Sequence, residues 1–261
     1  MNFPSYRDRY LPALTARQIA ALPDKARAPV ILTVGAIEQH GPHLPVAVDA
    51  LMGQVWLTRA LPLLPPGAAC YVSPPITIGK SNEHTGFPGT LMITKETLRA
   101  LLLAQAAQLA SWGFKHLAIV NTHGGNIAVI VTTLREIRAR YGLRADVLSM
   151  KIDYGISAQE AAFGIHAGEV ETSWLLAAAP QLVDMTKAAC EYPAALSDPG
   201  ELRPTVAPVT VAWCTRDLSV SGIMGDAPAA TAAKGERWLE QGARSLAAAI
   251  VALGRDAAAG A

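Results

Sequence analysis

The sequence is poor in cysteine, and the cysteines that it has lie far apart. They are Cys70, Cys190 and Cys214, an odd number with no CxxC pair among them. A disulfide framework needs cysteines that can pair, and a thiolate metal site needs them closely spaced. The sequence indicates neither, and we expect the protein to work in the reducing cytoplasm.

Charge and long apolar runs are also scarce. Charged residues make up 16% of the chain and the formal net charge is +1, which provides no broad field for nucleic acid or an anionic membrane. The N-terminal segment mixes charges and prolines where a secretory signal needs an apolar stretch, and no apolar run reaches the length of a membrane span. These features predict a soluble protein with a small-molecule substrate and no nucleic-acid or membrane partner.

Apolar residues, by contrast, are abundant. They make up 51% of the 261 residues, enough for the core of one large domain, and we assign residues 1–261 to a single domain. Short apolar runs alternate with longer segments of helical period, which is typical of βα units around a mostly parallel sheet in an α/β fold. The predicted strands are Pro29–Val34, His116–Asn121 and 145–150, with an extended stretch at 70–72. The predicted helices are 50–61, 94–112 with Thr94 as N-cap, 127 to about 142, and about 229–253, and a loop or lid is expected at 192–208.

A first polar cluster follows the strand Pro29–Val34. Glu38 and His40 are two residues apart in an extended segment, so they point to the same side and can approach one metal ion with a carboxylate and an imidazole. Asp49 can return to the same space after the turn that Gly41 permits. A bridging carboxylate is the usual way to hold two cations close together, and Asp49 is the candidate bridge.

Two further clusters have similar contents. His123 follows a strand and precedes the pair Gly124 and Gly125, at the carboxyl end of a parallel strand, where open α/β sheets bind ligands. His166, Glu169 and Glu171 lie within six residues at the start of an apolar helical run.

Each cluster also has a purely structural interpretation. A histidine beside glycine is often a turn residue, an aspartate before a helix is often an N-cap, and Gly-Gly-Asn after a strand can be a tight turn. Their coincidence favours function, because four of the six histidines lie in these segments beside acidic residues in a chain with little charge. The four are His40, His43, His123 and His166, whereas His116 starts a strand and is interpreted as structural.

Four sequence blocks resemble the signature blocks of the creatininase family. In chain order they are GAIEQHGPHLP (35–45) followed by Asp49, FPGT (87–90), NTHGGN (121–126) and HAGEVETS (166–173). The resemblance implies a three-layer α/β/α domain, two divalent cations of zinc, manganese or iron per chain, and a homo-oligomer, often a hexamer. It also implies that Glu38, Asp49 and His123 hold the first metal. His40 and the bridging Asp49 would hold the second.

One departure from the family pattern concerns the second metal. Creatininase proper has a glutamate ligand two residues after the histidine of the third block, where this chain has Gly125. We expect Glu169 to replace it, with Glu171 as the alternative or as a residue that orients an imidazole. Further candidates for contacting the substrate or orienting a ligand are His43, Glu83, His84, Gly124 and Gly125.

The expected reaction is hydrolysis of a C–N bond in a cyclic amide, a formamide or a related small amide. The attacking group would be a metal-bound hydroxide, and His166 would serve as general acid/base, a task suited to a group that titrates near neutrality. Creatinine is not the first choice, because residues 151–165 contain no tryptophan, whereas creatininase encloses creatinine with tryptophans. Related members act on formamides or trim a peptide during redox-cofactor maturation, and the sequence does not choose among them.

Two other classes of function remain open. A metal-binding protein of the same fold without catalysis is one, since Gly125 replaces a family ligand. A nucleotide-binding module is the other, and it is disfavoured because the chain has neither a GxGxxG motif nor a Walker lysine.

Overall fold

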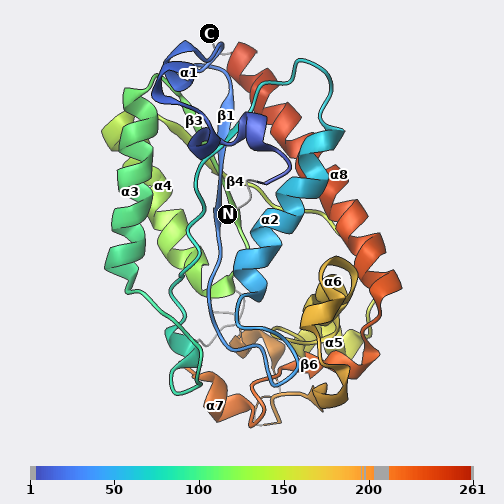
Figure 1. The fold of residues 1–261 in the computed structure, drawn as a ribbon. Coiled ribbons are helices and arrows are strands. Elements are labelled where there is room, and N and C mark those ends of the chain that lie inside the picture. The colour runs from blue at the N-terminus through green and yellow to red at the C-terminus, as the bar shows by residue number, and fades with distance from the viewer. Residues whose placement is uncertain (1–3, 195, 197, 203–211, 260–261) are drawn as a thin grey trace.

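A parallel sheet forms the centre of the molecule. The computed structural model describes residues 4–194, 196, 198–202 and 212–259 (Figure 1). Its main sheet has four strands in the order β2-β1-β3-β4, and all three pairings are parallel. The strands are β1 (Pro29–Val34), β2 (Tyr71–Val72), β3 (His116–Asn121) and β4 (Arg144–Val147). The predicted α/β class with a mostly parallel sheet is confirmed.

Helices cover both faces of this sheet. One face packs against α3 (Lys95–Ser111) and α4 (Ile127–Tyr141), and the other against α2 (Val48–Ala60) and α8 (Ala232–Ala259) (Figure 1). Every residue of β1 is buried, and successive side chains alternate between the layers, so that Ile31 packs with α2 and α8 while Leu32 packs with α3 and α4. A strand covered on both faces needs a continuous apolar run, which is what PVILTV provides.

Shorter elements gather beyond the end of the sheet at which β1 and β3 finish, at the bottom of Figure 1. They are α5 (Ala158–Phe163), α6 (Glu169–Ala178), α7 (Thr215–Leu218) and the antiparallel pair β5 (Cys190–Glu191) and β6 (Gly225–Asp226). The helix α1 (Ala16–Ala21) lies at the opposite end (Figure 1).

Most predicted boundaries agree with the structure. The strands β1 and β3 have the predicted bounds, and Thr94 caps α3 by accepting a hydrogen bond from the backbone N–H of Thr97. The strand expected at 145–150 is shorter, because the chain turns away from the sheet and the N–H of Lys151 donates to Ser245 Oγ on α8 (2.9 Å). The last helix begins at Ala232, after a 3-10 turn (Ala227–Ala229) that contains a proline.

Two other expectations are tested only in part. In the segment 192–208, a 3-10 helix spans Pro199–Leu202, whereas 195, 197 and 203–208 lie outside the described residues, so the proposed lid is not tested there. Within the described part of the chain, no helix combines the length and the apolar character that a membrane span requires.

Candidate metal and active site

The segment after β1 carries the first polar cluster into the interior. The N–H of Glu38 donates to the carbonyl of Val46 (2.8 Å), and Gly41 has a φ of 67°, a conformation that favours glycine, so the chain doubles back before α2. Asp49 lies in the first turn of α2, where its carboxylate Oδ1 is 3.6 Å from His40 Nε2. The structure thus brings Glu38, His40 and Asp49 together, with one ligand atom of each within 4.8 Å of the others.

The ring of His40 is oriented by the backbone. Its Nδ1 donates to the carbonyl oxygen of Glu38 (3.0 Å), and a neutral imidazole has a proton on only one nitrogen. In the neutral ring the lone pair is therefore on Nε2, the atom that faces Asp49.

His123 reaches the same carboxylates from the end of β3. Its Nδ1 lies 3.2 Å from Glu38 Oε2 and 3.4 Å from Asp49 Oδ2. The loop that carries it is held by Asn126, whose amide Nδ2 donates to the carbonyl of Gly35 (3.0 Å) and whose Oδ1 accepts from the N–H of Lys80 (2.9 Å). Asn126 belongs to the 3-10 helix η5 (Gly124–Asn126), so the Gly-Gly-Asn sequence both turns the chain and joins three loops.

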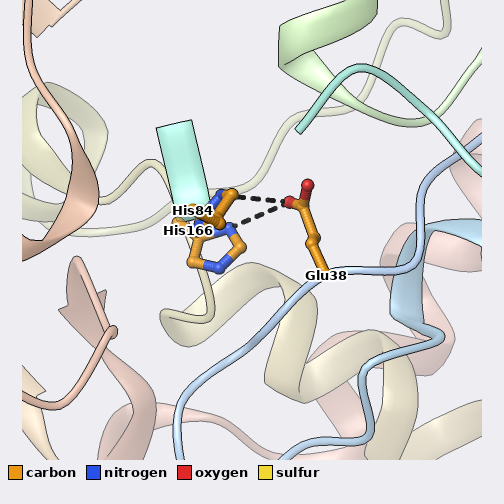
Figure 2. A group of neighbouring side chains, drawn as sticks. All are labelled: Glu38, His84 and His166. Carbon is orange, nitrogen blue, oxygen red and sulfur yellow. Dashed lines mark ion pairs between the residues drawn. The ribbon is translucent and has the colours of Figure 1, made fainter. Parts of the chain in front are cut away.

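His166 and His84 approach Glu38 from another side. Figure 2 shows both imidazoles beside the Glu38 carboxylate, with His84 Nε2 3.2 Å and His166 Nδ1 3.7 Å from Oε1. His84 is the last residue of the 3-10 helix η4 (Asn82–His84), and His166 lies just before α6. The His166 ring packs between those of His40 and His84, at centroid distances of 4.2 and 4.3 Å.

Gln39 connects these histidines, a role that we did not predict. Its side-chain Nε2 donates to His84 Nδ1 (2.9 Å) and to the carbonyl of Gly222 (3.1 Å), while its backbone carbonyl accepts from His166 Nε2 (2.7 Å). The signal in the sequence was its position between Glu38 and His40, two residues already assigned to the site. No pattern along the chain identifies its partners, which come from distant segments.

Glu171, and not Glu169, lies beside His40. Glu171 Oε2 is 3.7 Å from His40 Nε2, and the structure groups His40, His166 and Glu171 as a second possible set of ligands. Contrary to our expectation, the Glu169 carboxylate contacts Lys234 Nζ (2.6 Å). The reason is helical geometry, because residues two apart on α6 differ by about 200° around the axis and face opposite ways.

The other candidate residues are dispersed around this cluster. His43 Nε2 contacts Thr172 Oγ1 (2.9 Å) and so ties the first block to α6. Glu83 Oε1 lies 3.3 Å from His123 Nε2, on the far side of the ring from Glu38. No atom of the described residues lies within 4 Å of where a Cβ on Gly124 would be. At Gly125 that position is tightly enclosed by neighbouring atoms.

The buried charges alter the protonation of the cluster. Burial favours a neutral His40, but the carboxylates of Asp49 and Glu171 outweigh it and raise the pKa of His40 to about 9. For His123, burial is likewise outweighed by contacts with its carboxylate neighbours, which raise the pKa well above its usual value. Burial, together with the nearby His40 and His84, holds the pKa of His166 well below the ordinary range.

Several ligand-type atoms in the cluster lack hydrogen bonds. Within the described residues, Glu38 Oε2, His40 Nε2 and Asp49 Oδ2 are buried and have no hydrogen-bond partner. A buried polar atom without a partner costs about 1–3 kcal/mol, so such atoms call for an explanation. Carboxylate oxygens and an imidazole nitrogen that face one another are suitable ligands for zinc, manganese or iron. The residues present therefore fit a divalent-cation site.

Comparisons with known proteins agree with this arrangement. The family profile described as creatinine amidohydrolase matches residues 12–250. A mycofactocin precursor peptide peptidase of Mycobacterium ulcerans (strain Agy99) is 36% identical over 216 residues, which cover 80% of this chain and 78% of that protein.

Two other relatives carry the name of the family enzyme itself. A creatinine amidohydrolase of Pseudomonas putida is 29% identical over 243 residues, covering 85% of this chain and 88% of that protein. The solved structure of a manganese creatininase superimposes with a TM-score of 0.75 at 26% identity and covers 93% of this chain and 97% of its own.

Proposed function

The chain belongs to the creatininase family of hydrolases, and from that premise we propose that it is a dinuclear-metal amidohydrolase. The observation that carries the proposal is the buried group Glu38, His40 and Asp49, which have one ligand atom each within 4.8 Å of the others. Among the described residues, Glu38 Oε2, His40 Nε2 and Asp49 Oδ2 have no hydrogen-bond partner. Removing these atoms from water is costly unless protonated imidazoles or a bound cation replace the lost interactions.

We assign the ligands to two cations by proximity. Glu38, Asp49 and His123 would hold the first, since His123 Nδ1 lies within 3.4 Å of an oxygen of each carboxylate. His40, Asp49 and Glu171 would hold the second, with Asp49 shared. Glu171 thereby supplies the carboxylate for which we had proposed Glu169.

Bound cations of zinc, manganese or iron would lower the pKa of a water molecule toward neutrality and polarise the substrate carbonyl. The protein itself provides a proton carrier in His166. Its Nε2 donates to the Gln39 carbonyl, so its Nδ1 has the lone pair and faces Glu38. The low pKa keeps this ring neutral at pH 7 but makes it a weaker base than the expected imidazole that titrates near neutrality, so the proposed role rests on the position of Nδ1 in the cluster. There Nδ1 would take a proton from water and deliver it to the departing nitrogen.

The lack of a tryptophan in residues 151–165 favours a substrate other than creatinine. Tyr154, an aromatic residue of the segment 151–165, packs against Trp238 and Trp174 at centroid distances of 5.3 and 6.1 Å. It is therefore engaged in packing with these tryptophans. A formamide or another small amide remains our first substrate class. A peptide amide is the second, because a relative named for a precursor peptide is 36% identical.

The remaining features of the proposal follow from the family resemblance. We propose a single domain over residues 1–261 that assembles as a homo-oligomer, a hexamer by resemblance, and works in the cytoplasm. Light scattering coupled to size-exclusion chromatography tests the assembly, and a monomeric mass at micromolar concentration would contradict it.

The decisive experiment is turnover by the metal-loaded protein. Purified protein would be supplied with zinc, manganese or iron and incubated with formamides, lactams, ureides, creatinine and short peptides, with product amines measured by mass spectrometry. We expect hydrolysis of at least one class, and its loss on chelation. Protein that carries two cations and hydrolyses none of these amides would instead support a metal-binding protein without catalysis.

A further inference from the structure

Gly125 and Glu83 compete for the same space. A Cβ atom placed on Gly125 would lie 2.1 Å from Glu83 Oε1, 2.4 Å from the carbonyl oxygen of Lys80 and 2.5 Å from His123 Nε2. Real side chains do not approach so closely, so any residue larger than glycine must displace at least one of these atoms. The position at which creatininase proper has a glutamate is thus filled here by the carboxylate of another segment.

That carboxylate lies behind the His123 ring. Nδ1 of the ring faces Glu38 Oε2 and Asp49 Oδ2, while Nε2 faces the Lys80 carbonyl (3.1 Å) and Glu83 Oε1 (3.3 Å). Both nitrogens therefore face oxygens that can only accept, and a ring whose Nδ1 binds a cation keeps its one proton on Nε2, where the Lys80 carbonyl and Glu83 accept it. The lone pair is then on Nδ1, which is the atom nearest to Glu38 and Asp49.

We propose that Glu83 is a positioning residue for His123, and that Gly125 is required because it leaves room for this contact. The inference rests on the proposed function, in which His123 is a metal ligand. A carboxylate that accepts from the second ring nitrogen fixes the tautomer and makes the ligand nitrogen more basic. Glu83 therefore occupies the space of the family glutamate without taking its role as a ligand, which the proposed function assigns to Glu171.

The ion pair between Lys80 and Glu83 can be removed without removing the contact between Glu83 and His123. Lys80 Nζ lies 3.3 Å from Glu83 Oε2, the oxygen that faces away from His123. Replacing Lys80 with methionine removes this ion pair and leaves the Lys80 backbone carbonyl in place. The contact between Glu83 Oε1 and the ring should survive.

The test uses the Co²⁺-loaded full-length chain and does not depend on turnover. Cation affinity is measured by competition with a chelator, and the exchangeable ring N–H of His123 by its paramagnetically shifted proton resonance. In Glu83→Gln, which is isosteric, we expect the affinity for one cation to fall about tenfold or more and the resonance to shift or to exchange faster with water. Lys80→Met and the control Glu136→Gln, at a half-buried position on α4, should retain parental values.

A double-substitution cycle tests the shared space. Gly125→Ala should reproduce the loss of affinity, and its effect should be smaller in a Glu83→Ala background, because the two changes disturb one contact. Parental affinity and resonance in Glu83→Gln, or full additivity in the cycle, would overturn the proposal. If the parent binds two cations but hydrolyses no amide, the proposed function fails while these affinities still decide the role of Glu83.

Discussion

His40 Nε2 lies 3.7 Å from Glu171 Oε2, although the two residues belong to segments far apart in the chain. The backbone N–H of Ala167 donates to the same Oε2 (2.6 Å), so the carboxylate is held at the start of α6 and directed toward His40. Glu169, two residues earlier, contacts Lys234 instead. This pair of glutamates provides a matched comparison of a proposed ligand and a residue of the same type that pairs with lysine on one helix.

Glu171→Gln should selectively lower the affinity for one of the two cations, because it removes an anionic ligand while preserving the size of the side chain. Glu169→Gln should keep both cations and lower the melting temperature of the protein, since it breaks the ion pair with Lys234. Metal titrations of both variants check this, with melting followed by circular dichroism. Selective metal loss in Glu169→Gln alone would reverse the assignment.

Asp49→Ala should remove both cations, because Asp49 contacts both His40 (3.6 Å) and His123 (3.4 Å) and is the shared ligand in the proposed assignment. Metal content per chain, measured by elemental analysis after gel filtration, checks this. Asp146→Ala, on the edge strand β4, is the control and should keep parental metal content. A parental metal content in Asp49→Ala would show that Asp49 is not a ligand shared by two cations.

His166→Ala should keep both cations and lose kcat by roughly a hundredfold or more, the scale expected when general acid/base assistance is deleted. The geometry makes this a sharp test, because His166 also belongs to two of the possible ligand groups. Loss of metal in this variant would make His166 a ligand. An unchanged kcat on the substrate identified by the amide panel would remove it from the mechanism.

Cation binding should release protons at neutral pH. In the metal-free protein the carboxylates around His40 raise its pKa to about 9, so the ring is protonated at pH 7 and a cation must displace that proton. The affinity should therefore rise with pH up to about 9 and fall as the pH decreases below it. Calorimetry in buffers of different ionisation enthalpy measures the release, and buffer-independent enthalpies at pH 7 would contradict it.

Local sequence patterns predicted much of the framework. The run PVILTV is apolar throughout because β1 is covered on both faces, and it could be located without any tertiary information. The spacing of Glu38 and His40, followed by a glycine turn and Asp49, likewise placed three polar residues in one space. These features depend on residues near one another in the chain, where backbone geometry limits the possible arrangements.

The choice between Glu169 and Glu171 depended on the tertiary structure. Both lie in the same sequence block, and only the rotation of α6 about its axis, set by its packing on α8, decides which one faces His40. The position of Gly125 was interpreted from sequence as a missing ligand, whereas the fold places Glu83 there, against His123. Such contacts join loops from separate strands, and their geometry is determined by the packing of the whole sheet and its helices rather than by spacing along the chain.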